Sequence, residues 1–178
     1  MLEIILASLE VSIFAAFGTL TFAYTVQPPL KAALVSMVLA AFAFGLRNVL
    51  MEAFALNIVS ATFFVAFLAG FGGLASARIL RVPAEVISLP SVIPMIPGLF
   101  AYQTILSFEA FYKNENSTFA MQYMVAMVKN LLNTSLITLA LAIGIVFSLF
   151  VFYEQSFMMT RSTKHDKHSF WQFWRFRF

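Results

Sequence analysis

The sequence predicts an all-α protein, a polytopic membrane helix bundle of about five transmembrane spans in which a proline-rich break interrupts the fourth. Three observations carry this prediction. Of the 178 residues, 61% are hydrophobic and only 11% are charged, whereas a soluble domain has about a quarter charged residues. Several separate apolar stretches approach the length of about 20 residues that a helix needs to cross the hydrocarbon core. One of these stretches contains three prolines and a glycine, in the run Pro90–Gly98.

The predicted spans follow one another through short connections. They are expected at residues 4–26, 30–50, 57–80, 85–107 and 119–153. The first apolar stretch begins after Glu3, without a preceding lysine or arginine, and runs on to Tyr24. We therefore interpret it as a retained span and not as a signal peptide. Pro28 and Pro29 are expected to stop this helix and start the next. Residues 1–157 then form one transmembrane domain, followed by a basic, aromatic cytoplasmic tail at 158–178.

Five spans place the two ends of the chain on opposite sides of the membrane, and the basic residues indicate which side is which. With the C-terminus inside, the cytoplasmic segments hold eight basic residues: Lys31, Arg78, Arg81, Arg161, Lys164, Lys167, Arg175 and Arg177. The outer segments then hold only Arg47 and Lys113, and Lys129 lies inside a helix. The sequence therefore predicts an outer N-terminus and an inner C-terminus. The tail, which interleaves arginines with aromatic residues, suits an anionic membrane surface.

The run Pro90–Gly98 predicts a discontinuous helix. Each proline removes a backbone donor and clashes one turn back, and in hydrocarbon the freed carbonyls need a partner from protein, water or substrate. Half-helix ends at membrane depth favour a carboxylate at the N-terminal end and a cation at the C-terminal end. This pattern favours a transport function over a proline-kinked helix that only packs.

Small residues recur at four-residue spacing in three of the spans. The stripes are Ala69, Gly73 and Ala77; Ala140, Gly144 and Ser148; and Ser8, Ser12 and Ala16. Small residues allow helix backbones to approach closely in lipid. We interpret all three stripes as packing surfaces.

Three blocks of the sequence resemble the threonine/serine exporter family. They are GLRNVLM (Gly45–Met51), LAGFGGLASARIL (Leu68–Leu80) and PAEVISLPSVIPMIPGLFAY (Pro83–Tyr102). The chain is similar more narrowly to the small membrane subunit of that family, which corresponds to the C-terminal half of the fused exporters. The resemblance extends over about Gln27 to Phe152, and its most specific element is the spacing of Pro90, Pro94, Pro97–Gly98 and Tyr102.

The resemblance implies proton-motive-force-driven export of small hydroxy amino acids, threonine and serine, across the cytoplasmic (inner) membrane of a bacterium. It also implies a complex with a larger membrane subunit of the same family, because this chain corresponds to only half of a fused exporter. A second copy of the chain is the alternative partner. The alternative functions are export of a small dicarboxylate such as succinate, and a non-transporting role as an assembly subunit. The tail from Thr160 to Phe178 has no counterpart in the resemblance.

Polar groups around the break match the needs of a zwitterionic hydroxy amino acid. The candidate substrate-binding residues are Pro90, Ser91, Pro94, Pro97, Gly98, Tyr102, Gln103, Asn130, Asn133, Thr134 and Thr138. We expect backbone N–H groups after Pro97–Gly98 to bind the carboxylate, and carbonyls before Pro94 and Pro97 to accept from the ammonium. Gly98 would permit close backbone approach. The stripe from Asn130 to Thr138 either faces substrate or joins helices by hydrogen bonds.

Three charged residues are candidates for proton coupling or gating. Glu10 is the deepest carboxylate in the predicted spans, about 12 Å along its helix, unless that span begins later and leaves it at the outer surface. Arg47 and Glu52 lie five residues apart near one membrane boundary. They form either a gate pair or an interfacial anchor.

The sequence argues against an enzyme, a metal site or a cofactor. It has no cysteine, which excludes thiolate chemistry and cysteine-type metal sites. Its two histidines, His165 and His168, lie in the polar tail without a further ligand in view. No nucleotide-binding, zinc-protease or serine-hydrolase motif occurs. We expect the lipid bilayer to surround the chain, and we do not expect it to bind nucleic acid.

Overall fold

The computed structural model describes residues 2–114 and 117–151, and this part of the chain is helical throughout, without a strand. The elements are α1 (Leu2–Val26), α2 (Leu30–Ala53), α3 (Ile58–Leu80), α4 (Glu85–Val92), the 3₁₀ turn η1 (Ile93–Met95), α5 (Gly98–Lys113) and α6 (Ser117–Val151). Helices α1, α2, α3 and α6 are long and apolar enough to cross a membrane. The bent pair formed by α4–η1 and α5 makes up to five candidate spans when its two halves are taken as one span. The predicted all-α polytopic bundle is therefore confirmed, with a helix break in the region of the predicted fourth span. The predicted tail at 158–178 lies outside the described residues.

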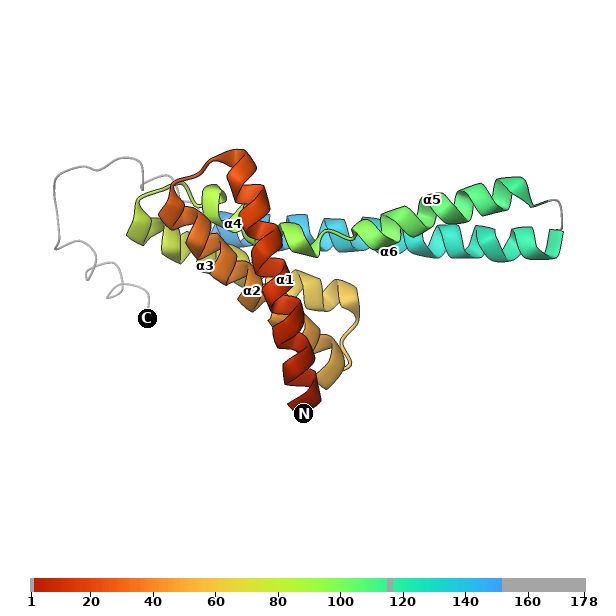
Figure 1. The fold of residues 1–178 in the computed structure, drawn as a ribbon, viewed down its shortest axis with the longest axis horizontal. Helices are drawn as coiled ribbons and strands as arrows, with labels where there is room; N and C mark the ends of the chain where they lie inside the picture. The colour runs from red at the N-terminus through yellow and green to blue at the C-terminus, as the bar shows by residue number, and fades with distance from the viewer. Residues whose placement is uncertain (1, 115–116, 152–178) are drawn as a thin grey trace.

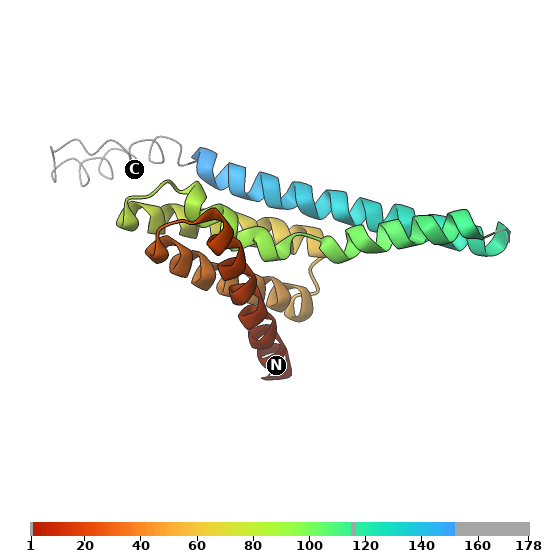
Figure 2. The ribbon, with the colours of Figure 1, turned by 45° about the horizontal axis from the view of Figure 1, so that its top comes forward.

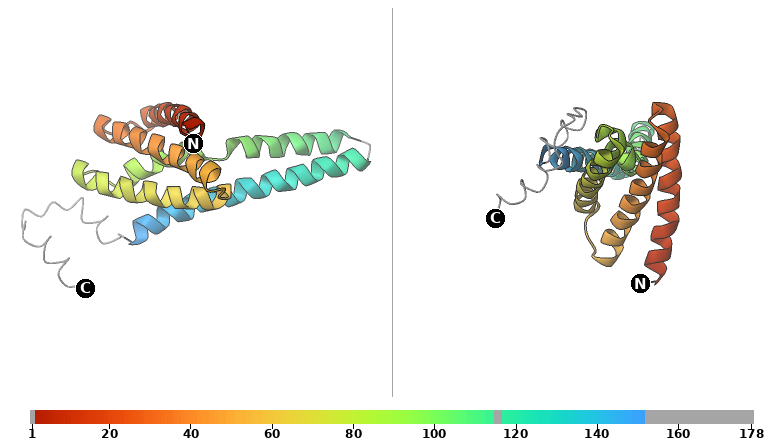
Figure 3. Two further views of the ribbon diagram at one scale, coloured as in Figure 1. Left: turned by 90° about the horizontal axis from the view of Figure 1, so that it is seen from below. Right: turned by 90° about the vertical axis from the view of Figure 1, so that its left-hand side faces the viewer.

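The helices form a layered bundle. Helix α1 lies at one edge and α6 at the other, with α2, α3 and α4 between them (Figure 3). Contacts follow this order, because α1 packs on α2, α2 on α3, and α3 on α6, while α4 fits against both α2 and α3. The core is built mainly from alanines and small aliphatic side chains, such as Ala43, Ala66 and Val65. Most large apolar side chains point outward, as expected for a protein whose outer solvent is lipid.

The first two helices turn back on each other at Pro28–Pro29. Gln27 adopts a left-handed conformation with φ 52°, and its N–H closes α1 on the Ala23 carbonyl oxygen at 2.9 Å. Pro29, which has no N–H to leave unpaired, then precedes the first residue of α2. Further along, Gly45 of α2 lies against Ser12 of α1, where a side chain on the glycine would collide with the serine hydroxyl. This small-residue contact lets α1 and α2 pack closely.

Helices α3 and α6 approach almost backbone to backbone. A Cβ atom added to Gly144 of α6 would lie 2.9 Å from the Phe63 carbonyl oxygen and 2.8 Å from the Ala66 Cβ atom. One turn later, Ser148 occupies the space beside Gly70 of α3. The stripe of Ala140, Gly144 and Ser148 thus packs closely on α3, as its packing interpretation predicts.

Helix α4 is short but deeply buried. It begins after Arg81, whose left-handed conformation (φ 54°) ends α3, and it runs back along α3 so that Ser88 packs against Gly73. Ile87, Ser88 and Ser91 are fully buried between α2 and α3. The first half of the interrupted span is therefore fixed firmly in the bundle.

Helix α5 and the first half of α6 form a hairpin that extends beyond the other helices (Figure 1, Figure 2). The 35 residues of α6 correspond to about 52 Å, longer than the hydrocarbon core of about 30 Å. None of the residues of α5 is buried. At its tip, Lys113 donates to the Glu109 carboxylate one turn earlier, which closes α5 with an exposed ion pair.

Candidate functional site

The interrupted span bends by 45° between α4–η1 and α5. Helix α4 ends at Val92, the 3₁₀ turn covers Ile93–Met95, and Ile96 is extended with φ −58° and ψ 129°. Pro97 then precedes the first residue of α5. The prolines of the break have no N–H group, so the helical hydrogen bonds cannot continue from α4 into α5.

Backbone groups within the break satisfy two of its carbonyls. The Ile93 carbonyl oxygen accepts from the Ile96 N–H at 3.0 Å, and the Ile96 carbonyl oxygen accepts from the Gly98 N–H at 2.8 Å. These are the carbonyls before Pro94 and Pro97 that the sequence suggested for a substrate ammonium. Each retains a second lone pair, so an added donor would share the oxygen with a backbone N–H.

Side chains from α1 and α2 reach two further carbonyls of the interrupted span. The Thr19 hydroxyl of α1, which also donates to the Ala15 carbonyl of its own helix at 3.0 Å, lies 3.5 Å from the Pro90 carbonyl oxygen. Arg47 of α2 donates from its guanidinium to the Met95 carbonyl oxygen at 3.5 Å. The break is therefore held by polar groups of both neighbouring helices.

Arg47 is half-buried beside this break. Its guanidinium stands 4.3 Å from the centre of the Phe44 ring, a favourable cation–π arrangement. In the described part of the chain, neither Arg47, Glu52 nor Glu10 takes part in an ion pair. The structure thus brings Arg47 to the break, while Glu52 and Glu10 have exposed side chains at the end of α2 and on α1.

The predicted residues of the break itself differ in exposure. Pro90, Ser91 and Pro97 are buried, and the Ser91 hydroxyl donates to the Ser88 carbonyl at 2.7 Å. Pro94 is partly buried and lies against α1 near Gly18. In contrast, Gly98 is exposed, and a Cβ atom built there would have nothing within 4 Å.

Two predicted residues follow on α5. Tyr102 is 59% exposed, and Gln103 is also exposed, so both side chains lie on the surface of the chain one turn beyond the break. The described residues leave them open to a partner, to lipid or to a ligand.

The polar stripe of α6 runs beside the break. Met95 and Ile137 share one buried cluster, and α5 and α6 pack along each other as a hairpin (Figure 1). The Thr134 and Thr138 hydroxyls donate to carbonyls of their own helix, both at 2.8 Å. Within the described residues, the side-chain amides of Asn130 and Asn133 make no hydrogen bond.

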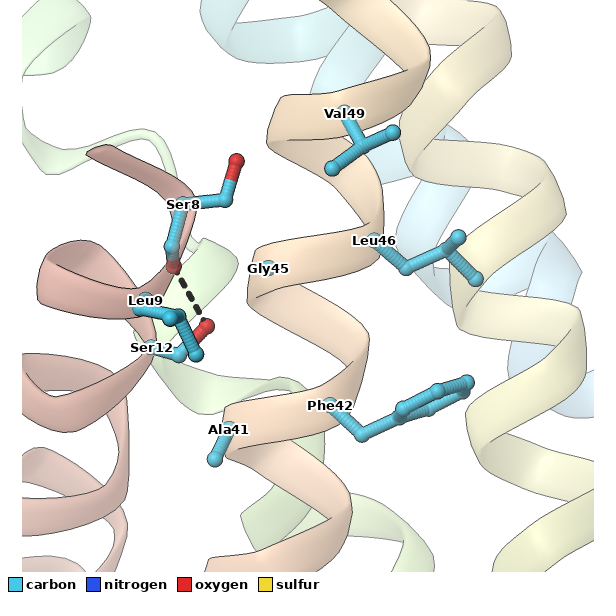
Figure 4. A pocket seen from close by; sticks show the side chains of 8 residues that line it. All are labelled: Ser8, Leu9, Ser12, Ala41, Phe42, Gly45, Leu46 and Val49. Atoms are coloured by element: carbon cyan, nitrogen blue, oxygen red, sulfur yellow. Dashed lines mark hydrogen bonds between the residues drawn. The ribbon is translucent and has the colours of Figure 1, made fainter. Parts of the chain in front are cut away.

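A groove of about 370 Å³ lies between α1 and α2, and none of the residues that line it belongs to the break (Figure 4). It is lined by Ser8, Leu9, Ser12, Ala41, Phe42, Gly45, Leu46 and Val49, none of which the sequence singled out for substrate. Its polar groups are occupied, because the Ser12 hydroxyl donates to the Ser8 carbonyl at 2.6 Å and Asn48 donates to the Ser8 hydroxyl at 3.3 Å. A zwitterion would find few free partners there, so we regard the groove as part of the helix-packing surface.

Sequence reasoning missed one residue of the site, Thr19, and one contact, that of Arg47 with Met95. Thr19 is one of several threonines on α1, and nothing in the sequence separates it from Thr21 or Thr25. The contact of Arg47 with the Met95 carbonyl joins residues 48 positions apart. Only the arrangement of α1, α2 and η1 brings these groups together. No cluster of metal-ligating side chains occurs within residues 2–114 and 117–151.

Comparison with known proteins gives one family. The family described as Threonine/Serine exporter, ThrE matches residues 11–151, which contain the interrupted span and most of every long helix. No solved structure matches the chain. The match includes Thr19, Arg47 and the whole break.

Proposed function

Because the chain belongs to the threonine/serine exporter family, we propose that it is the small membrane subunit of a secondary transporter that exports threonine and serine. In this proposal it works in the cytoplasmic membrane of a bacterium and draws on the proton motive force. The protein is a multi-pass membrane protein of the exporter type. We propose in addition that its cargo is threonine and serine, that the proton motive force drives export, and that the chain acts as one subunit of a complex.

The observation that carries the proposal is the architecture of the break. Its first half packs between α2 and α3, and Thr19 and Arg47 donate hydrogen bonds to two of its carbonyls. Its second half begins at Gly98, which has free space beside its Cα atom. A broken span with a fixed backbone and free space at the next helix start is typical of binding sites in secondary transporters. We propose that cargo binds at the start of α5, where Gly98 allows it to approach the backbone.

The exposed hairpin supports a partner subunit. Helix α5 buries none of its residues, although it carries large apolar side chains such as Leu99, Ile105 and Phe108. Five spans leave little room for one chain to enclose a hydrophilic path. We propose that the larger subunit of the exporter packs on this hairpin and completes the path, with a second copy of this chain as the alternative.

Proton coupling needs a titratable group that both sides of the membrane reach in turn. Glu10 and Glu52 are the candidate carboxylates of this chain. Glu10 lies within the apolar first span, and its side chain is exposed. We propose that Glu10 faces the partner subunit and takes part in coupling, because an ionised carboxylate facing lipid would be unfavourable.

Efflux from preloaded cells tests the proposal. Cells lacking their own exporters are loaded with threonine, serine or succinate, and they express this chain alone, this chain with the larger subunit, or neither. The proposal expects threonine and serine efflux only with both chains, and loss of that efflux when a protonophore collapses the proton gradient. Efflux of succinate alone would favour the dicarboxylate exporter. If no cargo leaves although both chains are inserted and copurify, the assembly-subunit role is the better account.

A further inference from the structure

Arg47 places a positive charge at the break with few acceptors around it. A guanidinium has five N–H donors, yet within the described residues Arg47 donates a single hydrogen bond, the long one to the Met95 carbonyl. The one ion pair in this part of the chain joins Glu109 and Lys113, at the far end of α5. Among the described residues, Arg47 therefore has no carboxylate to neutralise it.

The surroundings of this charge are apolar. Met95 belongs to a buried cluster with Ala43, Val65 and Ile137, and Phe44 covers one face of the guanidinium. A half-buried charge in such surroundings is costly unless an opposite charge pairs with it. An anion that enters the break would supply that charge.

Backbone donors lie next to the same place. The start of α5 leaves the N–H groups of Leu99 and Phe100 without an acceptor in the described part of the chain, since Gly98 donates to Ile96 and Ala101 donates to Pro97. Met95 precedes Gly98 by three residues, so at most about 11 Å of backbone separates them. Gly98 has open space beside it. The side chain of Arg47, from α2, thus contacts the same short segment that leads into the positive end of α5.

We propose that Arg47 recognises the carboxylate of the transported molecule, in a site completed by the free N–H groups of the first turn of α5. The inference rests on the proposed function and names the chemical group by which the cargo is held. A guanidinium suits this role because it binds a carboxylate through two parallel hydrogen bonds. The site accepts amino acids and dicarboxylates alike, and it rejects analogues in which the carboxylate is replaced by a neutral amide.

The contact with Met95 offers a competing role. Arg47 could serve only to satisfy the Met95 carbonyl, which would make it a structural residue with no part in recognition. The two roles differ in what a substitution changes. A structural residue affects the amount of folded protein and the maximal rate for every cargo, whereas a carboxylate-binding residue changes affinity for carboxylates alone.

Binding to the purified full-length chain in lipid nanodiscs tests the proposal. The probes are threonine, succinate and threoninamide, and their apparent Kd values come from the rise in melting temperature with probe concentration. We expect wild type to bind threonine and succinate at least about ten-fold more tightly than threoninamide. Arg47→Gln should weaken binding of both carboxylates at least about ten-fold and leave threoninamide unchanged. Arg47→Lys should bind both carboxylates with an affinity between those of wild type and Arg47→Gln. Lysine keeps the positive charge but lacks the two parallel N–H donors of the guanidinium.

Arg78→Gln is the matched control. Arg78 is an exposed basic residue near the end of α3, away from the break, and its substitution should leave all three Kd values unchanged. The proposal is overturned if wild type binds neither carboxylate, if it fails to discriminate threonine from threoninamide, or if Arg47→Gln binds carboxylates as wild type does. If Arg47→Gln does not fold, the comparison of probes on wild type still tests carboxylate recognition, and Arg47→Lys then tests the part of Arg47 in it.

Transport separates this inference from the proposed function. If efflux requires both chains and Arg47→Gln leaves the KM for threonine unchanged, the inference fails and the exporter function stands. If wild type binds carboxylates through Arg47 but exports none of them with its partner, the exporter function fails and the binding site stands. A raised KM with an unchanged maximal rate supports both.

Discussion

Glycine determines how closely the helices of this bundle approach. Gly73 and Gly72 are neighbours on α3, but they face different surroundings. A Cβ atom on Gly73 would lie 3.0 Å from the Ser88 Cα atom and would collide with the Ser88 hydroxyl. A Cβ atom on Gly72 would instead have the Leu39 side chain nearest to it, with one methyl group at 2.9 Å. The first contact is with the backbone of α4 and the second with a side chain that can turn away.

We expect Gly73→Ala to destabilise the protein by about 1–3 kcal/mol, because α4 must move away from α3 to admit the methyl group. Gly72→Ala is the matched control and should stay within about 1 kcal/mol of wild type, since Leu39 can adjust and alanine favours the helix. Thermal unfolding of the purified chain in one detergent measures both variants. Equal melting temperatures for the two would contradict the packing of Ser88 against Gly73.

At the scale of elements, prolines set the direction of the interrupted span. Pro94 and Pro97 prevent a continuous helix from forming between α4 and α5. Carbonyls of the break that lack helical donors accept instead from backbone turns, Thr19 and Arg47. The break is therefore an alternative hydrogen-bonding scheme and not a loosened helix.

Pro97→Ala should reduce threonine efflux about ten-fold or more, because the new N–H can extend α5 toward η1 and redirect its start. Pro83→Ala is the control. Pro83 lies exposed between α3 and α4, and its loss should leave efflux near the wild-type rate. Efflux is measured in cells that express each variant with the larger subunit, after copurification shows that the complex assembles. Unchanged efflux for Pro97→Ala would argue that the break only packs.

The sequence predicted the elements better than their contacts. The helix ends predicted from proline and charge patterns lie close to those of the structure. Pro28, Pro29 and the prolines of the break restrict the backbone of their immediate neighbours, so a local pattern is enough to predict these ends. The apolar pattern suggested that the fourth span ends near residue 107, whereas α5 continues to Lys113 and α6 begins at Ser117. Helical propensity and the Glu109–Lys113 pair extend this helix past the apolar stretch. Arg47 and Thr19 reach the break only through tertiary packing, which no local pattern encodes.

At the scale of the whole molecule, the short connections between helices determine which loops lie at the same end of the bundle. The short turns make neighbouring spans antiparallel, so the hairpin tip near Asn114 and the connection near Pro83 lie at opposite ends of the interrupted span. The distribution of basic residues predicts that the tip is outside and the connection is inside. Because the chain has no cysteine, single cysteines can report these positions without a background of other thiols.

We expect Asn114→Cys to react with a membrane-impermeant maleimide in intact cells. Pro83→Cys should react only after the cells are permeabilised. Labelling of each variant after denaturation measures its total thiol, and the labelling in cells is expressed relative to that total. The reverse pattern would invert the predicted orientation, and labelling of both positions in intact cells would show that the two segments do not lie on opposite sides.

The central claim is that the start of α5 lines a hydrophilic path for cargo, and thiol accessibility at Gly98 tests it most directly. Gly98→Cys is made in the full chain, expressed with the larger subunit in membranes, and modified by a hydrophilic thiol reagent with and without threonine. Leu139→Cys, whose native side chain is 56% exposed on α6, serves as the control for a lipid-facing position. The account predicts rapid modification at Gly98, protection by threonine, and slow modification at Leu139 that threonine does not alter. Equally slow modification at both positions, unaffected by threonine, would contradict it.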